Sequence, residues 1–366
     1  MKIRPLKAKH LYFGIFFWFV QWLCILILDK NRMWWTPLYE SSLYPFINTI
    51  LLKVFHIFSF SIGDLVYFAC ILLLIFHIFK VVQSKGKSFV RYLLFWIWLS
   101  GLAHLLFHLH WGLNYLRTPE IEFSLAEEPY TAEELYHFSL ELAQRAEILF
   151  QRMQAQDSSF DLPFQPKQSP KQMFIDAFDT WNMLATTSSN EFKSICSKST
   201  KTSLYSTLLS YMGYSGYINP FTHEAQINVN IPKYNMPTTI LHEMSHQTGV
   251  ADEGVANWLG FRTSVLSKHD YMQYSGYTYA LKYCFRNLYQ LDETLGDQLK
   301  ERISPAVWAN FIETERYFEK YASPLEFVSK HFYDLFLKYN KQQDGIKGYN
   351  RLVDVLLKHP LPEFNP

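Results

Sequence analysis

An uncharged apolar run near the start of the chain, Leu11 to Leu28, limits the possible folds more than any other feature of the sequence. It holds 18 residues (LYFGIFFWFVQWLCILIL), which as a helix would measure about 27 Å, close to the thickness of a hydrocarbon core. The run therefore predicts a membrane-spanning helix. A cleaved signal peptide is the competing interpretation, but the run is longer than an h-region and meets Asp29 without a small-residue cleavage site.

Two further spans are predicted, Ile62 to Val82 and Tyr92 to Leu113, which are apolar apart from Asp64 and several His. Basic residues gather before the first span and between the second and third: Lys2, Arg4, Lys7, Lys9, Lys80, Lys85, Lys87 and Arg91. By the positive-inside rule both groups belong in the cytoplasm. We therefore expect a multi-pass protein of the cell membrane, in contact with the lipid bilayer, whose C-terminal domain is extracytoplasmic.

The segment from Trp34 to Phe60 lies between the first two spans and mixes apolar with polar residues. It predicts an interfacial amphipathic helix, although a fourth, poor span would reverse the topology. The third span carries His104, His108 and His110. Ionisable residues inside a membrane are candidates for function, and a metal or haem there would make the protein a redox or transport component. We favour a structural role, because these residues lie toward the outer end of the span.

The composition changes near Leu116 to that of a soluble domain. We expect an N-terminal transmembrane α-helical bundle with three spans and an interfacial segment (1–116), followed by an α+β, mainly helical domain (117–366). Helix starts are predicted at a capping box and at three Ser-Pro pairs: Thr131 to Glu134, Ser169-Pro170, Ser304-Pro305 and Ser323-Pro324. Strands are expected within 213–230 and an exposed connection over 188–203. With 34 Lys and Arg against 33 Asp and Glu, no nucleic-acid partner is expected.

The candidate site is the motif H-E-x-x-H, formed by His242, Glu243 and His246. Positions i and i+4 share one helix face, so both imidazoles can bind one metal ion while Glu243 acts on a water molecule beside it. Pro237 and Gly249 mark the two ends of this helix.

A second helix follows closely, with Asp252 as its N-cap and Glu253 in its first turn. A tight helical hairpin can return Glu253 to the metal as a third ligand, although an acid in a first turn can also simply complement the helix dipole. Asp252 and His223 are the next candidates for this position. Three ligands with one open position are typical of a catalytic zinc rather than a structural one.

These residues carry a resemblance. H-E-x-x-H followed by Glu253, Ala256 and Asn257 resembles the gluzincin metallopeptidases, which implies a zincin-like domain with zinc on His242, His246 and Glu253 and with Glu243 as general base. The wider pattern resembles the membrane-anchored domain of unknown function family 3810. Its recurrent blocks are similar to Trp111–Tyr115, Asn219–Thr222, Glu224–Gln226 and Tyr333–Lys338.

The sequence thus predicts a membrane-anchored zinc metallopeptidase that hydrolyses a peptide or protein substrate. The run Ala225 to Asn230 could be an edge strand to which an extended peptide adds, or an ordinary strand. Five tyrosines have the chemistry of an oxyanion stabiliser without singling one out: Tyr271, Tyr274, Tyr277, Tyr279 and Tyr283. The main alternative is a non-catalytic, zinc-binding membrane sensor or assembly factor with the same fold. Cys196 and Cys284 could pair in an oxidising compartment, or remain free thiols.

Overall fold

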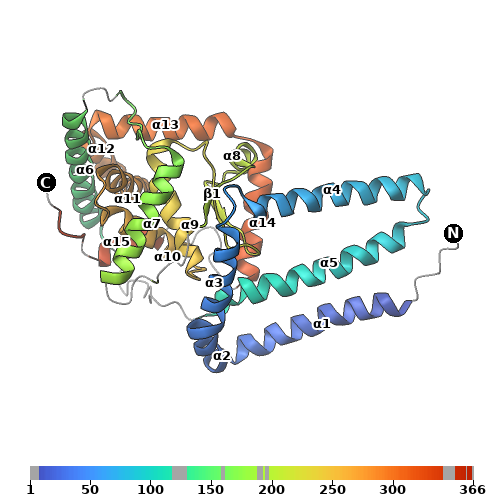
Figure 1. Ribbon diagram of the computed structural model, residues 1–366. Coiled ribbons are helices and arrows are strands. Elements are labelled where there is room, and N and C mark those ends of the chain that lie inside the picture. Colours follow the sequence, from blue (N-terminus) through green and yellow to red (C-terminus); the bar gives the residue numbers. More distant parts are fainter. Residues whose placement is uncertain are drawn as a thin grey trace.

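Three long apolar helices project from one side of a mainly helical domain in the computed structural model (Figure 1), which describes residues 8–117, 130–157, 161–187, 193, 198–340, 351–359 and 361–364. They are α1 (Ala8–Lys30), α4 (Ile62–Gln83) and α5 (Phe89–His110). Each is long and apolar enough to cross a membrane. The three predicted helices are confirmed, with ends shifted by up to three residues.

The connection between α4 and α5 lies at the end of these helices that is remote from the domain, beside the N-terminal end of α1 (Figure 1). A turn with positive φ at Lys85 and Gly86 reverses the chain there. Lys87 follows in the same connection. The basic residues that the structure describes in this connection are therefore separated from the domain by the full length of the helices.

The segment between α1 and α4 runs across the direction of the three long helices (Figure 1). It consists of α2 (Arg32–Leu38), the π-helical turn η1 (Tyr39–Leu43) and α3 (Tyr44–Phe55). Asn48 on α3 donates a hydrogen bond to the carbonyl of Gln247 at 2.7 Å, so α3 packs against the domain. Among the described residues, the helices suited to cross a membrane number three and do not include this segment.

The domain is built from helices whose starts follow the predicted caps. Thr131 forms a full capping box with Glu134, and Ser304 and Ser323 accept hydrogen bonds at the starts of their helices. The elements are η2 (Gly112–Leu116), α6 (Ala132–Gln156), α7 (Pro170–Thr187), α8 (Ser206–Met212), η3 (Lys233–Asn235), α9 (Met236–Gln247), α10 (Glu253–Val265), α11 (Asp270–Leu291), α12 (Glu293–Arg302), α13 (Pro305–Tyr321), α14 (Pro324–Tyr339) and α15 (Arg351–Lys358).

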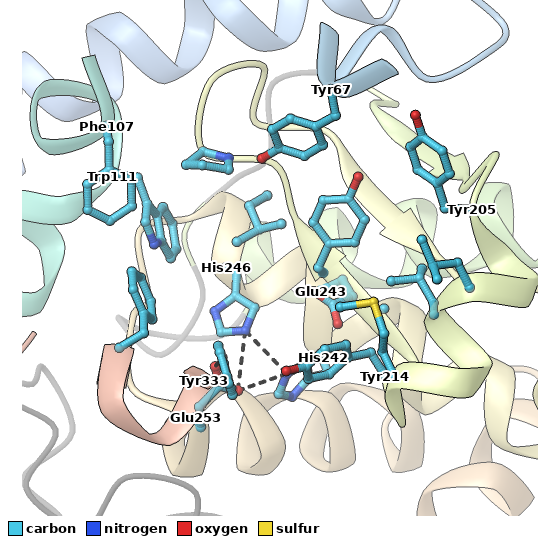
Figure 2. A pocket seen from close by; sticks show the side chains of 18 of the residues that line it. Tyr67, Phe107, Trp111, Tyr205, Tyr214, His242, Glu243, His246, Glu253 and Tyr333 are labelled. Carbon is cyan, nitrogen blue, oxygen red and sulfur yellow. Dashed lines mark hydrogen bonds and ion pairs between the residues drawn. The ribbon is translucent and has the colours of Figure 1, made fainter. Parts of the chain in front are cut away.

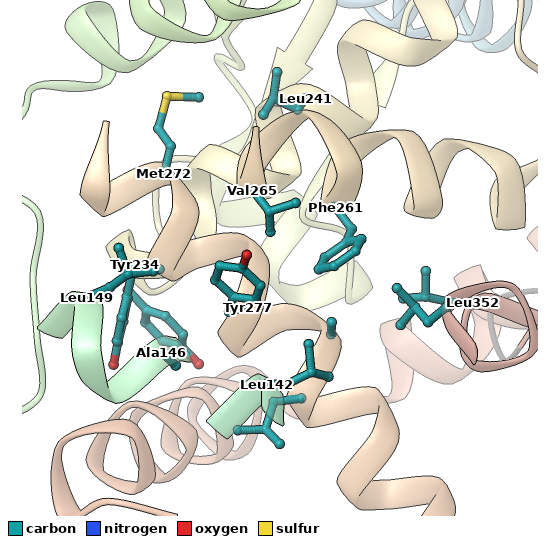
Figure 3. Packing of buried hydrophobic residues seen from close by; sticks show 14 of the residues in the cluster. Leu142, Ala146, Leu149, Tyr234, Leu241, Phe261, Val265, Met272, Tyr277 and Leu352 are labelled. Carbon is teal, nitrogen blue, oxygen red and sulfur yellow. The ribbon is translucent and has the colours of Figure 1, made fainter. Parts of the chain in front are cut away.

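The hydrophobic core surrounds α11, which packs against α6, α9, α10, α12 and α15. Figure 3 shows Leu142 of α6, Val265 of α10 and Tyr277 of α11 in this core. Tyr277 is 1% exposed and Leu142 is fully buried. Burial of such side chains contributes roughly 25 cal/mol per Å² of apolar surface. It stabilises the packing of α11 against the helical hairpin α9–α10.

A small sheet lies beside α9, with strand order β1-β3-β2. Its strands are β1 (Thr200–Thr202), β2 (Gly216–Ile218) and β3 (Ala225–Ile227). β3 pairs with both neighbours, parallel to β1 and antiparallel to β2. The idea that β3 is an edge strand is therefore wrong, because both of its edges are already hydrogen-bonded. The ordinary-strand interpretation holds, and β2 lies at the edge of the sheet.

The expected exposed connection over 188–203 is also wrong at its end. Lys201 is only 5% exposed, because its ammonium group contacts the carbonyls of Phe55 and Phe58 and lies 3.8 Å from Glu224. A buried ammonium is tolerated where such acceptors compensate its lost hydration. Cys196 lies outside the described residues, while Cys284 is a buried free thiol whose pKa burial raises to about 12.

The N-terminus of α4 is bonded directly to the domain. The Glu224 carboxylate accepts hydrogen bonds from the backbone N–H groups of Ile62 and Gly63, at 3.2 and 2.7 Å. Asp64 accepts one from Leu204 N–H at 2.6 Å. A Cβ on Gly63 would lie 2.3 Å from Asn219 Nδ2, so this close approach requires glycine. Two buried carboxylates, Glu224 of the domain and Asp64 of α4, thus hold the start of α4 against the domain.

Candidate functional site

The H-E-x-x-H motif lies on α9, whose two ends are as predicted. Pro237 stands in the first turn, and Gly249 follows the last turn with φ +94°. A Cβ on Gly249 would lie 2.6 Å from Arg117 Nη1 and 2.8 Å from Tyr44 Cε1. Glycine is therefore needed there both for the left-handed conformation and for the close approach of Tyr44, from the segment between α1 and α4, and of Arg117, which follows α5.

Three ligand atoms come together at the turn between α9 and α10 (Figure 2). His242 Nε2 lies 3.2 Å from His246 Nε2, and Glu253 Oε2 lies 3.3 Å from the first and 3.6 Å from the second. Within the part of the chain that the structure describes, this is the group of His, Cys and acidic residues with the proximity of a metal site. The predicted ligands are thus assembled in one place.

Glu253 is positioned from two sides. Asp252 caps α10 by accepting a hydrogen bond from Val255 N–H at 2.9 Å, which fixes the first turn in which Glu253 stands. The Tyr333 hydroxyl on α14 donates to Glu253 Oε1 at 2.6 Å, leaving Oε2 directed at the two imidazoles. His223, the other alternative ligand, is bonded to Asn48 and to the carbonyl of His110 instead.

The electrostatic environment of the cluster favours a protonated His246 and an ionised Glu253. Burial alone would lower the pKa of His246, but the Glu253 carboxylate and further hydrogen bonds raise it to about 9. Burial would likewise raise the pKa of Glu253, yet the rings of His246 and His242 hold it well below its usual range. Val250 accepts a hydrogen bond from His246 Nδ1 at 2.6 Å, so Nε2 is the nitrogen left to face Glu253.

Glu243 lies beside this cluster and is 4% exposed. Burial raises its pKa, an effect that the rings of His242 and His246 reduce and the charge of Glu253 increases. Among the described residues, no donor bonds its Oε2. Gly216 of β2 leaves the space that this side chain occupies, because a Cβ there would lie 2.7 Å from Glu243 Oε1. The Glu243 carboxylate is therefore buried, has a raised pKa and keeps one oxygen without a hydrogen-bond partner among the described residues.

A pocket of about 450 Å³ opens onto these groups. Figure 2 shows Tyr67 and Phe107 on the far side of the pocket from His242 and Glu253, while Trp111 lies beside His246, with ring centroids 5.8 Å apart. Its wall consists of Tyr67, Ile71, Phe107, Trp111, Tyr115, Tyr205, Leu208, Leu209, Met212, Tyr214, Gly216, Tyr217, Ile218, Pro220, His242, Glu243, His246, Glu253, Tyr333 and Phe336. The charged or titratable groups at the motif are thus surrounded by apolar and aromatic side chains.

The five tyrosines of α11 that had the chemistry of an oxyanion stabiliser do not line this pocket. Tyr271, Tyr274 and Tyr277 are buried in the core around α11, and the Tyr279 hydroxyl donates to Asn257 at 2.7 Å. Their spacing reflects the packing of a central helix. The tyrosines that do line the pocket come from other segments of the chain: Tyr67, Tyr115, Tyr205, Tyr214, Tyr217 and Tyr333.

His104 and His108 of the third span make contacts within the helix bundle, whereas the ring of His110 lies against that of His223 in the domain. His104 Nδ1 bonds Gln21 Oε1 of α1 at 3.0 Å, and its ring lies 4.5 Å from that of Trp18. His108 Nδ1 bonds the carbonyl of His104 at 3.0 Å. Within the described residues these rings do not form a metal-binding group, so the geometry favours the structural interpretation.

Sequence reasoning missed the roles of Tyr333, Gly216 and the two span residues Tyr67 and Phe107. Tyr333 meets Glu253 across 80 positions, and no local pattern indicates a contact of that kind. The block of residues that begins at Tyr333 was singled out only through the family resemblance. Gly216 gave no signal beyond being a glycine near a predicted strand.

Comparison with known proteins places the chain in a family. The family model described as protein of unknown function (DUF3810) matches residues 39–357, which is most of the chain, and the chain therefore belongs to this family. Neither a curated protein nor a solved structure matches it.

Proposed function

We propose that this member of the DUF3810 family is a membrane-anchored zinc peptidase in which Glu243 is the general base. One observation carries the proposal: Glu243, a buried carboxylate with an unbonded oxygen, stands beside three convergent metal-ligand atoms at the wall of a pocket. A structural metal site has no use for such a neighbour, because it closes its coordination with protein ligands.

The spacing of the ligand atoms supports zinc. Zinc binds imidazole nitrogen and carboxylate oxygen at roughly 2.0–2.2 Å with tetrahedral geometry, which places neighbouring ligand atoms about 3.3 Å apart. The three separations among His242, His246 and Glu253 are 3.2, 3.3 and 3.6 Å. The donor set of two His and one Glu matches that of catalytic sites with one open position.

The residues of the candidate site would each have a distinct role in peptide hydrolysis. Bound zinc would supply Lewis acidity, which makes water more acidic and polarises a carbonyl. Glu243 would accept the proton of the attacking water and deliver it to the amine of the leaving product. Tyr333 would keep Glu253 in its binding orientation through the 2.6 Å hydrogen bond. The aromatic wall would exclude bulk water and so strengthen these interactions.

The lining of the pocket disfavours a substrate that is bound by its terminal carboxylate. The carboxylates of Glu243 and Glu253 and the imidazoles of His242 and His246 accompany the tyrosines in the wall, and among the residues that the structure describes the wall contains no Lys, Arg or Asp. Recognition of a terminal carboxylate would require a cationic partner. Gly216, Tyr217 and Ile218 of the edge strand β2 line the pocket, so an extended peptide could add to the sheet there by backbone hydrogen bonds.

The test is the variant Glu243→Gln in the full-length protein. Because Glu243 is not a ligand in this proposal, the variant should keep one zinc per chain and its melting temperature. Loss of the general base should slow peptide cleavage by about 100-fold to 10,000-fold. Alanine in place of His242, His246 or Glu253 should instead lower zinc content, measured by metal analysis of protein purified without added metal.

Because the natural substrate is unidentified, the assay compares extracytoplasmic and membrane proteins of cells that carry the wild-type or the Glu243→Gln protein. Uncut proteins should accumulate in the variant. If both strains give the same proteome and both differ from a deletion strain, the protein acts without catalysis, as a zinc-binding sensor or assembly factor.

A further inference from the structure

We infer that the pocket opens toward lipid and that its substrate is a polypeptide anchored in the same membrane, cut next to its membrane segment. This inference rests on the proposed peptidase function and adds the substrate class and its route of entry. It is carried by the position of the pocket, by its rim and by helix α14.

The pocket reaches down between two of the long apolar helices. Tyr67 and Ile71 of α4 and Phe107 of α5 belong to its wall. From Ile62, where α4 begins, to Ile71 the helix rises about 14 Å at 1.5 Å per residue. Part of the wall therefore lies well inside the predicted span rather than above it.

The rim of the pocket is apolar. Ile71 and Leu208 are the wall residues with large exposed apolar side chains, at 51% and 46% exposure. Ile71 stands on a helix suited to cross a membrane, and Leu208 stands on α8 of the domain. A rim of this kind is unfavourable toward water, at roughly 25 cal/mol per Å² of apolar surface, but carries no such penalty toward lipid.

Helix α14 supports the same position of the membrane surface. Five of its six large exposed apolar side chains follow the helical spacing of three and four residues and form one stripe: Leu325, Val328, Phe332, Leu335 and Tyr339. The sixth, Phe327, lies outside this stripe and is 79% exposed. Charged residues Lys330, Asp334 and Lys338 lie between the stripe residues in the sequence. Figure 1 shows α14 lying across the direction of α4 and α5, where they meet the domain. This is the orientation and pattern of an amphipathic helix at a membrane interface.

The same helix joins this surface to the site. Phe336 contacts the ring of Phe107 on α5, with centroids 5.9 Å apart, and Tyr333 holds Glu253. The stripe on one face of α14 and the metal ligand on another are therefore separated by one helix diameter, about 10–12 Å. A stripe at the interface places the metal site near headgroup level.

The chemistry of the wall selects the occupant. An anchored polypeptide entering from lipid presents apolar side chains, which the aromatic and aliphatic side chains of the wall accept. A segment drawn out of a membrane helix loses its internal backbone hydrogen bonds and needs replacements in a dry environment. The edge strand β2 offers them, because Gly216, Tyr217 and Ile218 lie in the wall beside Glu243.

The first experiment asks what surrounds the rim. The photoreactive residue p-benzoylphenylalanine replaces Leu208, Phe332 or Leu291 in the full-length protein, reconstituted in phosphatidylcholine vesicles. Leu291 is the control, because it is 56% exposed at the end of α11, away from the long helices (Figure 1). Illumination should add the mass of one phospholipid at positions 208 and 332 and none at 291. Absence of the adduct at position 208 would overturn the inference.

The second experiment tests the substrate class in the same vesicles with zinc-loaded protein. Two peptide pools carry the same random uncharged segments behind the same Leu/Ala transmembrane helix. In one pool the segment follows the helix directly, and in the other a Gly/Ser linker of about 20 residues moves it roughly 25 Å away on average. Both are anchored, so their concentration in the membrane is matched.

Direct attachment should give cleavage at least about tenfold faster, which corresponds to roughly 1.4 kcal/mol, and Glu243→Gln should abolish it. Equal rates for the two pools would overturn entry from lipid and leave the peptidase proposal standing. If neither pool were cut by protein that contains zinc, the peptidase proposal would fail, and the substrate class with it. The lipid adduct at position 208 reports whether the rim faces lipid even when no peptide is cut. A failure of lipid access can therefore be distinguished from a failure of peptidase activity.

Discussion

The Tyr333 hydroxyl donates a hydrogen bond of 2.6 Å to Glu253 Oε1 across 80 positions of the chain. It joins α14, which carries an exposed apolar stripe, to the third ligand of the candidate metal site. A ligand carboxylate that is held in this way loses little freedom when it binds a metal ion.

Tyr333→Phe removes that hydrogen bond while keeping the ring. We expect zinc affinity to fall by about 10-fold to 100-fold, the usual effect of losing a partner that orients a ligand. Competition with a chelator of known affinity measures it. Tyr339→Phe is the matched control, because Tyr339 is 65% exposed on the same helix. Equal affinities for wild type and Tyr333→Phe would show that Glu253 does not need this partner.

Zinc binding should release about one proton near pH 7. In the metal-free protein the pKa of His246 is raised from 6.5 to about 9, so the ring is protonated at pH 7, whereas zinc binds only the neutral ring. Affinity should therefore fall about tenfold per pH unit as the pH drops below about 9. Calorimetry in buffers of different ionisation enthalpy counts the proton. A binding enthalpy independent of the buffer would contradict this prediction.

Gly216→Ala should displace Glu243 without touching a ligand. The added Cβ would lie 2.7 Å from Glu243 Oε1 and 2.8 Å from the carbonyl oxygen of Gln226. We expect peptide cleavage to fall by at least about 100-fold, as when a general base is lost, with zinc content retained. Ser215→Ala, one position earlier, is the control. Normal cleavage by Gly216→Ala would mean that the carboxylate can act from another position.

Gly249→Ala should destabilise the domain. A residue with Cβ in the left-handed conformation costs roughly 1–2 kcal/mol, and here the Cβ would also meet Arg117 and Tyr44. Gly86→Ala is the matched control, because Gly86 has φ +83° with no atom within 4 Å of an added Cβ. Thermal unfolding in detergent should show a larger loss for Gly249→Ala, and the difference measures the contact. Equal losses would indicate that Arg117 and Tyr44 move aside.

The domain is expected outside the cytoplasm. The connection with Lys85 and Lys87 lies at the opposite end of the long helices from the domain, and basic connections stay in the cytoplasm. Alkaline phosphatase fused after Arg117 should be active, because it folds only outside the cytoplasm. Maturation of a cytoplasmic fluorescent reporter at the same point would reverse the topology.

The features predicted from the sequence are those that depend on neighbouring residues. The apolar run of α1, the capping box at Thr131 and the left-handed Gly249 are local and were confirmed. The two His and Glu253 also follow from short spacings. Residues that depend on distant partners were not predicted: Lys201 was expected to be exposed, yet carbonyls from the segment before α4 bury it.

The position of β3 shows the same limit. Its alternating residues were compatible with an edge or a central strand, since alternation reports which faces are buried and not which edges are paired. The strand is central because β1 pairs in parallel with its second edge. In this pairing Thr200 lies opposite Ala225, 25 positions later in the chain. The pairing surface beside the site therefore belongs to β2.

The bonds from Glu224 to Ile62 and Gly63 tie the domain to the first turn of α4, a helix long and apolar enough to cross a membrane. In the proposed membrane peptidase, this attachment would hold the candidate site at a fixed depth relative to the bilayer. Such a peptidase would select the bond to cut by its distance from the membrane boundary. Substrates of unrelated sequence would then be cut at the same depth.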